Sequence, residues 1–415
     1  MKKSKYMVYP IFLAMFDDPM PNTNVTTDSG MTAEMRVFYD KVLIKNAQPE
    51  LVHDQFAQKR NIPANSGNTI KFRKYTQLPK ATTPLTEGVT PNGQKLSVTE
   101  FGATVHQYGG YVTLSDRLIL EAADNNIVEA TELLGSQAGR TLDTITREVL
   151  NGGTNVQYGD GTKVSRCKLV GGESTGNDYL TVRACRMAAR SLKHVNAKKR
   201  DGKYWAGIIN PDVEFDIMDD PDWKYPHQYV DTENLYENEI GAVAGIRFSE
   251  TTEAKVFHAE DLASDSRTLL VNGAISSAST TVTFDGGTVA ASALIGRYVL
   301  IGDQRVKVTA NTTTTMTVDT AVTATDNAVI YPGEAGAKGR DVYSTLIFGA
   351  EAYGTTEIEG GGLRHIVKQL GSGGTSDPLD QRATVGWKAT KTAVRLVEEN
   401  MVRIETCSNF ESGAN

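Results

Sequence analysis

The segment IVEATELLGSQAGRTLDTITREVL, residues 127–150, carries the strongest helical pattern in the sequence. Its apolar side chains recur every three or four positions, as on one face of an amphipathic helix. Asn151-Gly152-Gly153 follows and favours termination. A continuous helix from the region of Asp124 would be about 40 Å long, which is long enough to be the spine of a domain. The repeated positions are Ile127, Ala130, Leu133, Leu134, Ala138, Leu142, Ile145 and Val149.

The stretch before this helix predicts an extended hairpin. Apolar residues alternate with polar and basic ones from Asn68 to Tyr75, and the alternation resumes from Leu96 to Tyr111. About twenty residues rich in proline and glycine separate the two strands. A compact domain seldom keeps so long a polar loop without a function. A flexible surface loop is the alternative interpretation.

A second helix is expected after the first, starting near Asn177 or Asp178 and carrying Leu180 to Leu192 inward. Its outer face is basic. Tyr204 to Ile209 then predicts a strand, and Asn210-Pro211-Asp212 starts a short helix that ends near Met218. The outward basic residues of the second helix are Arg183, Arg186, Arg190 and Lys193.

The amino-acid composition and pattern of the remaining sequence change twice. Gly241 to Phe248 predicts one strand, and residues 262–332 are rich in Thr, Ala, Val, Gly and Ser with few charges, which indicates a small all-β insertion. After it, Ala383 to Thr390 and Thr392 to Ile404 predict two closing strands. The chain therefore returns to its first domain after an insertion.

Composition limits the function. With 415 residues, the chain exceeds the roughly 250–300 at which one core stops growing, so several packed units are expected. A formal net charge of -7 disfavours tight free binding to nucleic acid. The three cysteines are odd in number and never spaced as C-x-x-C, which favours a reducing compartment. The apolar stretch Met7 to Phe16 contains Pro10 and lacks a cleavage site, so it predicts no export.

The sequence lacks the common motifs of catalysis and metal binding. It contains no Walker A loop, H-E-x-x-H, C-x-x-C or G-x-S-x-G. The carboxylates between Asp216 and Asp222 lack the spacing of a calcium loop, and the six histidines show no ligand spacing. We therefore expect no catalytic residues, no cofactor and no metal site, and no apolar run approaches the roughly 18 residues of a membrane span.

Five stretches follow one another along the chain. They are Leu85 to Pro91, Tyr108 to Val112 with Ser115-Asp116, Ile209 to Asp212, Gly245 to Phe248, and Gly371 to Gln381 leading into Val385-Gly386-Trp387-Lys388. No single stretch is specific alone, but in this order they resemble the major capsid proteins of tailed bacteriophages, in detail the podovirus-type family, a variant of the tailed-phage and herpesvirus capsid fold. The resemblance spans about residues 35–405 and is interrupted only by the β-rich insertion.

The resemblance implies an α+β fold with a peripheral domain built on a long spine helix and a β-sheet, an axial domain, an extended hairpin loop and an N-terminal arm, together with the small all-β insertion. The expected divisions are an arm at 1–63, the hairpin loop at 64–114, the peripheral domain with its spine helix at 115–203, the axial domain at 204–261, the insertion at 262–335, an axial return at 336–375 and peripheral closing strands at 376–415.

The resemblance also implies a function, namely self-assembly into pentamers and hexamers of an icosahedral virion head that encloses double-stranded DNA. Assembly is expected in the cytoplasm of the host bacterium, with scaffolding, portal and decoration proteins as further partners. The chain would meet DNA by proximity only, and no membrane is expected to be involved. The hairpin would reach over a neighbouring subunit. Candidate intersubunit residues are Lys71, Arg73, Lys74, Lys80 and Glu87.

Two interpretations of the basic helix remain open: Arg183, Arg186, Arg190 and Lys193 could line the inner wall and face packaged DNA, or form a solvated helix face. Two alternative functions also remain. A hydrolase with an appended carbohydrate-binding β domain would explain the insertion, but it requires a catalytic constellation. A phage tail-type protein or surface adhesin would share the Thr-rich region, but not the hairpin, spine helix and closing strands.

Overall fold

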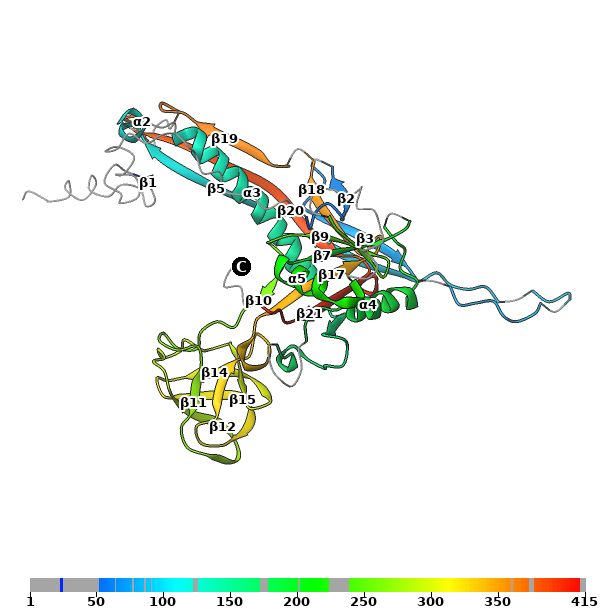
Figure 1. Ribbon diagram of the computed structural model, residues 1–415. Coiled ribbons are helices and arrows are strands. Elements are labelled where there is room, and N and C mark those ends of the chain that lie inside the picture. The colour runs from blue at the N-terminus through cyan, green and yellow to red at the C-terminus, as the bar shows by residue number, and fades with distance from the viewer. Residues whose placement is uncertain are drawn as a thin grey trace, which may run out of the picture.

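A computed structural model describes residues 23–24 and 52–410, apart from 64, 77, 86, 91, 122–125, 172–177, 201, 224–238, 360 and 373–376. The arm expected at 1–63 therefore lies largely outside the described residues. Figure 1 shows an elongated body with a hairpin that projects to one side and a β-barrel that lies below.

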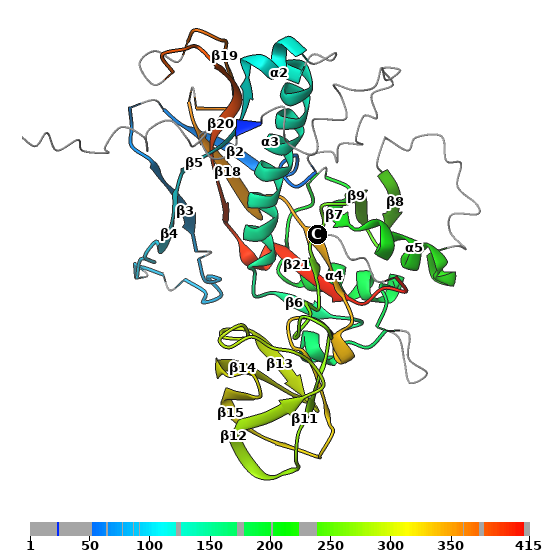
Figure 2. The same cartoon turned by 90° about the vertical axis from the view of Figure 1, so that its left-hand side faces the viewer.

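A six-stranded sheet, which we call the first sheet, supports the spine helix. Helix α3 (Asn126–Asn151) lies along one face of this sheet, where Leu134 and Ala138 pack against Val385, Trp387 and Ala389 (Figure 2). A short helix, α2 (Asp116–Glu121), precedes it. The strands, in order across the sheet, are β1 (Thr23–Asn24), β5 (His106–Ser115), β20 (Arg382–Arg395), β18 (Tyr353–Ile358) and β2 (Gln58–Ile62), with β19 (Arg364–Lys368) beside β20.

The second sheet has a helix layer on one face. Helices α4 (Val182–His194) and α5 (Pro211–Asp219) bury their apolar sides on it, and all seven residues of its strand β17 (Val342–Phe348) are buried. Asn210 caps α5 by accepting a hydrogen bond from the Asp212 amide. The order is β6 (Val156–Tyr158), β21 (Met401–Thr406), β17, β7 (Trp205–Ile209), β9 (Ile246–Glu250) and β8 (Glu239–Val243), with β10 (Val256–Phe257) beside β17.

The insertion is a closed six-stranded barrel with its own apolar core. Closure removes the exposed edges that an open sheet would leave. The barrel therefore buries its own apolar side chains. Its strands are β11 (Leu269–Val271), β12 (Ile275–Asp285), β15 (Thr315–Ala324), β14 (Gln304–Asn311), β13 (Tyr298–Ile301) and β16 (Val329–Pro332). Single 3-10 turns occur at Arg166–Lys168, Ala337–Gly339 and Glu398–Asn400.

The hairpin is a two-stranded sheet of its own, formed by β3 (Thr69–Tyr75) and β4 (Val98–Thr104). The sequence correctly predicted this hairpin, the spine helix, the short helix at 211 and the all-β insertion. It was wrong in extending the hairpin's second strand to Tyr111, because β5 starts at His106 and pairs with β20 instead. The alternation of side chains continues across Val105, so the pattern does not reveal the change of partner.

Three other boundaries were also wrong. The basic helix begins at Val182 rather than near Asn177, because Thr181 accepts a hydrogen bond from the Ala184 amide and caps it. The strand expected at 241–248 is a hairpin, because Ala244 and Gly245 have φ of 54° and 82° and form a tight turn. The closing strand β20 continues through Lys391, whose buried ammonium group pairs with Asp54.

The expected grouping of elements also differs in two places. The sequence groups helix α4 with the spine helix, yet it packs beside α5 on the second sheet. The two closing strands are expected together, yet β20 belongs to the first sheet and β21 to the second. In each case the periodicity of the segment shows that one face is buried but does not identify the element that covers it.

Candidate interaction surfaces

The described residues contain no group of three or more His, Cys, Asp or Glu side chains that could hold a metal ion. The side chains of Cys167, Cys185 and Cys407 are buried, and burial raises the pKa of the Cys185 thiol to about 12. None of the helices in the described ranges is long and apolar enough to cross a membrane. The surface of the molecule carries the remaining candidate features.

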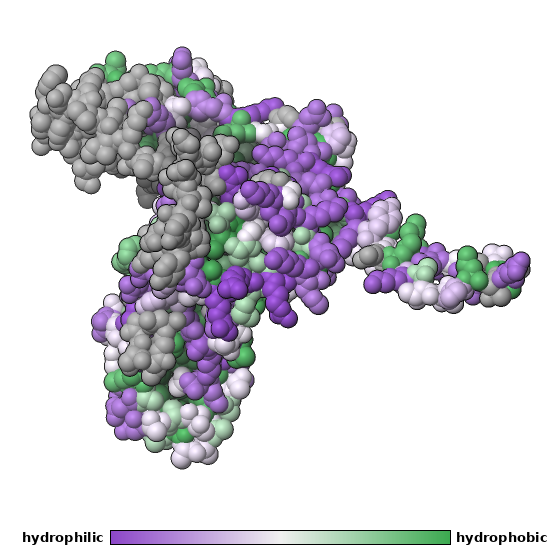
Figure 3. Space-filling view, turned by 45° about the vertical axis from the view of Figure 1, so that its right-hand side comes forward, coloured by the Kyte–Doolittle hydropathy of each residue, from purple (hydrophilic) through white to green (hydrophobic). Residues whose placement is uncertain are grey.

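The projecting hairpin exposes apolar side chains to solvent. Tyr75, Leu85 and Leu96 are 62%, 78% and 70% exposed, and hydrophobic residues follow its length in Figure 3. A two-stranded ribbon has no interior in which to bury them, and an isolated hairpin is marginally stable in water. Exposed apolar groups on such an element are typical of a surface that another protein covers.

Three of the five candidate intersubunit residues have partners within the chain. Lys71 and Arg73 both pair with Glu100 on the opposite strand, at 3.2 and 3.1 Å, and the hydrogen bond from Lys71 is the main reason that the pKa of Glu100 is lowered. Lys74 pairs with Glu399 of the body at 3.2 Å. These basic residues join the hairpin strands and attach the hairpin's base to the body.

The two other candidates, Lys80 and Glu87, lie in the loop at the tip of the hairpin and are exposed. No hydrogen bond or ion pair of either side chain is found within the described part of the chain. Glu87 stands between the exposed side chains of Leu85 and Val89. The tip thus presents apolar groups with one carboxylate among them.

A trough of about 520 Å³ lies on the first sheet. It crosses β5, β20 and β19 and is lined by Thr384, Gly386 and Lys388, whereas α3 packs on the alternate residues of β20. Glycine is required at two positions of its floor. A Cβ added at Gly386 would lie 2.8 Å from the Cβ of Tyr111, and one added at Gly109 would lie 2.7 Å from the carbonyl oxygen of Trp387. The absence of side chains at these two glycines therefore avoids both clashes.

The lining of the trough combines basic and apolar groups. Lys368, Arg382 and Lys388 contribute three cations. Asp377, the one carboxylate among the described residues of the lining, already accepts a hydrogen bond from the Arg382 amide at 2.9 Å. Tyr111 is 73% exposed beside it, and all five residues of the edge strand β19 are exposed. The trough therefore favours an occupant that is apolar and carries a negative charge.

The basic residues of α4 lie together on one exposed face, as the sequence predicted. Ala184, Cys185, Ala188 and Leu192 are buried on the opposite side. Arg183 lies 4.0 Å from Asp160. Arg186, Arg190 and Lys193 continue the same exposed face along the helix.

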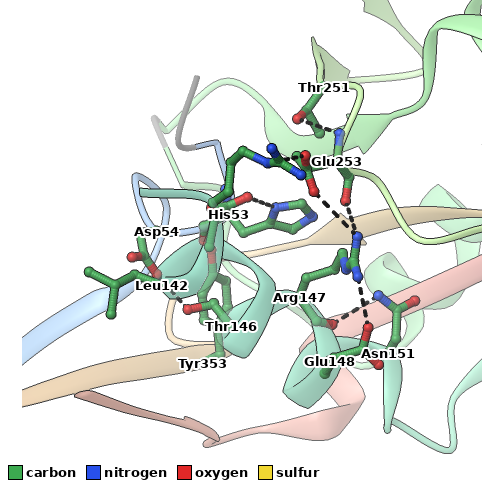
Figure 4. A network of polar contacts seen from close by, with 12 residues as sticks. His53, Asp54, Leu142, Thr146, Arg147, Glu148, Asn151, Thr251, Glu253 and Tyr353 are labelled. Atoms are coloured by element: carbon green, nitrogen blue, oxygen red, sulfur yellow. Dashed lines mark hydrogen bonds and ion pairs between the residues drawn. The ribbon is translucent and has the colours of Figure 1, made fainter. Parts of the chain in front are cut away.

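The root of the arm is fixed by a buried polar network that sequence reasoning missed (Figure 4). The His53 ring contacts the Asp143 carboxylate of α3 through Nδ1 at 2.6 Å, and the His53 amide donates to the same carboxylate at 3.0 Å. Asp54 accepts from Thr146 at 2.6 Å and pairs with Lys391. The contacts between His53 or Asp54 and the helix span about 90 residues of sequence, so no local pattern signals them.

A second missed network lies where the barrel joins the body. Glu405 is fully buried and binds the Arg166 guanidinium through two bonds of 2.7 Å. Arg403 approaches the same carboxylate at 2.8 Å, and its pKa is lowered by burial. Arg166 also stacks on Phe257 at 3.3 Å and donates to the carbonyl of Glu334, just after the last barrel strand. The network thus links β21 to the root of the barrel.

Two carboxyl groups interact beside α5. Burial raises the pKa of Glu214 to about 7, and the adjacent Glu250 carboxyl adds to the increase. The folded protein therefore holds more protons than the unfolded chain between the ordinary glutamate pKa and about 7, so this group's contribution to stability is lost as pH rises through that window.

Glu250→Gln is expected to weaken this pH dependence without abolishing it, because burial, the larger cause of the raised pKa, remains. Urea unfolding of dissociated subunits at about pH 5 and about pH 7.5 would measure the change. Glu260→Gln, at a side chain that is 79% exposed, is the control and should leave the dependence unaltered. An equal pH dependence in the Glu250→Gln variant and the wild type would contradict the assignment.

Comparisons with known proteins give a consistent result. A family model described as phage capsid protein matches residues 98–252, which include β4, β5, α3, α4 and α5. No curated protein matches the sequence significantly. The matched segment contains the spine helix and both helices of the second sheet.

The fold is similar to solved capsid structures. The cyanophage Pam1 capsid protein aligns with a TM-score of 0.58 at 11% identity, covering 92% of this chain and 98% of the other. The capsid protein of Ralstonia phage GP4 aligns with a TM-score of 0.56 at 10% identity, covering 99% and 100%. That of cyanophage P-SCSP1u gives 0.54 at 13% identity, covering 90% and 93%. The chain therefore has the fold of these phage capsid proteins, and its residues 98–252 match the family model of phage capsid proteins.

Proposed function

We propose that the chain is the repeating subunit of an icosahedral head, in which pentamers and hexamers enclose double-stranded DNA. The hairpin carries this proposal, because it exposes apolar side chains away from any core of its own subunit. Such an element gains stability only when a neighbour covers it. A shell provides such a neighbour for every copy, and many weak overlaps then add up to a stable particle.

The trough on the first sheet supports a specific neighbour contact. The hairpin tip offers Leu85, Val89 and one carboxylate, Glu87, and the trough offers an open glycine floor and three cations. Within one subunit the hairpin points away from this sheet. We propose that the tip of one copy lies in the trough of the next, where Glu87 meets the cations.

The further partners are proposed from the family alone. Scaffolding, portal and decoration proteins would act during or after assembly in the host cytoplasm, and DNA would be held by enclosure, since a net charge of -7 does not favour direct binding. The matching family model is described as phage capsid protein, and we propose that the chain acts without catalysis.

Negative-stain electron microscopy with sedimentation of the chain expressed alone, and then together with its scaffolding protein, tests the function. Closed shells, or rings of five and six copies, support it. A species that stays monomeric in both experiments would refute it. Activity against glycosides or esters would instead favour the hydrolase alternative.

Glu87→Lys is expected to reduce the yield of shells about fivefold, the change in an equilibrium constant that the loss of one exposed ion pair produces. The reason is that a lysine would face Lys368, Arg382 and Lys388 in the trough. Yield would be measured as the fraction of protein that sediments as shells at fixed concentration.

Asp285→Lys, an equal charge reversal on an exposed barrel position, is the matched control and should assemble normally. Combining Glu87→Lys with Lys388→Glu should recover part of the yield. A Glu87→Lys variant that assembles as well as its control would exclude this site for the tip.

A further inference from the structure

The outer side of α5 combines apolar and acidic groups. We call it the acidic face and define it by Phe215, Met218, Asp219, Asp222 and Phe410. Phe215 and Phe410 are 55% and 44% exposed, although their rings contact each other at 5.2 Å in an edge-to-face arrangement. Met218 beside them is 37% exposed. Exposed aromatic and methionine side chains grouped in this way are typical of the centre of a protein contact.

The ionisable residues that lie near these apolar groups in the sequence all have one sign. Between residues 211 and 223 every ionisable side chain is a carboxylate. Burial raises the pKa of Asp216, and burial with Glu250 raises that of Glu214 to about 7, so the acids crowd one another. A cationic partner would relieve this repulsion. The carboxylates are Asp212, Glu214, Asp216, Asp219, Asp220 and Asp222.

The complementary surface occurs on the same chain, on α4. We call the exposed row of Arg183, Arg186, Arg190 and Lys193 the basic face. Within the subunit, the end of α5 is joined to the start of α4, where the Asp220 carboxylate accepts a hydrogen bond from the Val182 amide at 2.9 Å. Arg190 and Lys193 lie about 12 and 16 Å further along the helix, so they extend away from the acidic face of their own subunit.

We infer that the basic face of α4 in one copy binds the acidic face of α5 in the next copy, within the rings of copies that the proposed function requires. The two surfaces differ, so each subunit presents one surface to the copy before it and the other to the copy after it, and the contact repeats around a closed ring. Arginine fits both parts of the acidic face, because its guanidinium pairs with carboxylates and stacks on aromatic rings.

Packaged DNA is the alternative partner for the basic face, but it explains fewer of these observations. It would leave Phe215, Met218 and Phe410 exposed and would place phosphates near a subunit that is negative overall. A second copy covers both faces at once. The observations therefore favour a protein partner.

Cysteine cross-linking tests the contact directly, because the three native cysteines are buried and two introduced thiols would be the accessible ones. Ser191→Cys on α4 and Met218→Cys on α5 are both exposed positions. Assembled double variant treated with a short bismaleimide should give a ladder of bands up to the ring size on a denaturing gel, whereas each single variant should give monomers. Dimers alone, or no cross-link in intact shells, would overturn the inference.

Charge exchange supplies a second test. Arg186→Glu with Arg190→Glu, and separately Asp219→Lys with Asp222→Lys, should each lower shell yield at least tenfold, which corresponds to two lost ion pairs. The combined variant should recover assembly. Circular dichroism of each variant would establish whether the subunit still folds.

The outcomes separate this inference from the proposed function. If the variant with Arg186→Glu and Arg190→Glu forms shells normally but retains less DNA, the basic face belongs to DNA and the inference is overturned, while the shell function stands. Folded single-face variants that the combination does not rescue would also overturn it. Wild-type protein that forms no rings or shells, even with its scaffolding protein, would instead refute the proposed function.

Discussion

Replacing residues 77–96 with a two-residue Asn-Gly turn is expected to abolish shell formation and to leave the subunit folded. The shortened loop joins the same strands, β3 and β4, and Asn-Gly is the preferred sequence for a tight hairpin turn. The deleted loop contributes nothing to the buried clusters of either sheet. Stability of the subunit should therefore change little, while every neighbour contact of the tip is lost.

Sedimentation measures assembly of this variant, and urea unfolding measures its stability. A second variant keeps the full hairpin but changes Leu85, Val89 and Leu96 to serine. It tests whether assembly needs the exposed apolar side chains or only the length of the hairpin. We expect it to fail as well. Thr82→Ser with Thr83→Ser is the neutral control. Normal shells from the shortened hairpin would refute its role in assembly.

The elements that could be predicted from the sequence are those whose pattern is local. Helix α3 was predicted almost to its ends, because a 3.6-residue period sustained over 26 residues has one interpretation. The hairpin strands and the helix cap at Asn210 likewise depend on neighbouring residues. Each of these signals lies within one element.

What could not be predicted depends on partners far away in the chain. Nothing in the sequence near Lys391 indicates that Asp54, 337 residues away, makes a lysine tolerable inside a long buried strand. Closure of the barrel depends on pairing between β11 and β16, which are separated by nearly the whole insertion. The trough likewise arises where three strands from different parts of the chain meet.

The candidate contact residues illustrate the same limit. The sequence correctly indicated that the hairpin is basic, but it could not show that Glu100 neutralises Lys71 and Arg73 from the opposite strand. The structure shifts the assembly hypothesis from the strands to the tip, where Lys80 and Glu87 lie. It also reveals the trough on the first sheet as a surface that the tip could bind, and no local sequence motif indicates this trough.

Glu405→Ala is expected to lower the free energy of unfolding by about 3–5 kcal/mol, the cost of removing one partner from a buried ion pair. The carboxylate is fully buried, and Arg403 beside it is 8% exposed. Without Glu405, the Arg403 guanidinium loses the group that most opposes the effect of burial on its pKa. Arg166 loses both of its bonds to the carboxylate.

Urea unfolding of dissociated subunits would measure the loss. Glu399→Ala is the matched control, since Glu399 also pairs with a cation but is 67% exposed, and we expect it to cost about 1 kcal/mol or less. Glu405→Gln keeps the shape and one acceptor oxygen for Arg166, so its cost should fall between the two. Because Arg166 also contacts Glu334 at the root of the barrel, Glu405→Ala should make that junction more accessible to protease than Glu399→Ala does. Equal stability of the two alanine variants would show that the buried carboxylate does not hold this junction together.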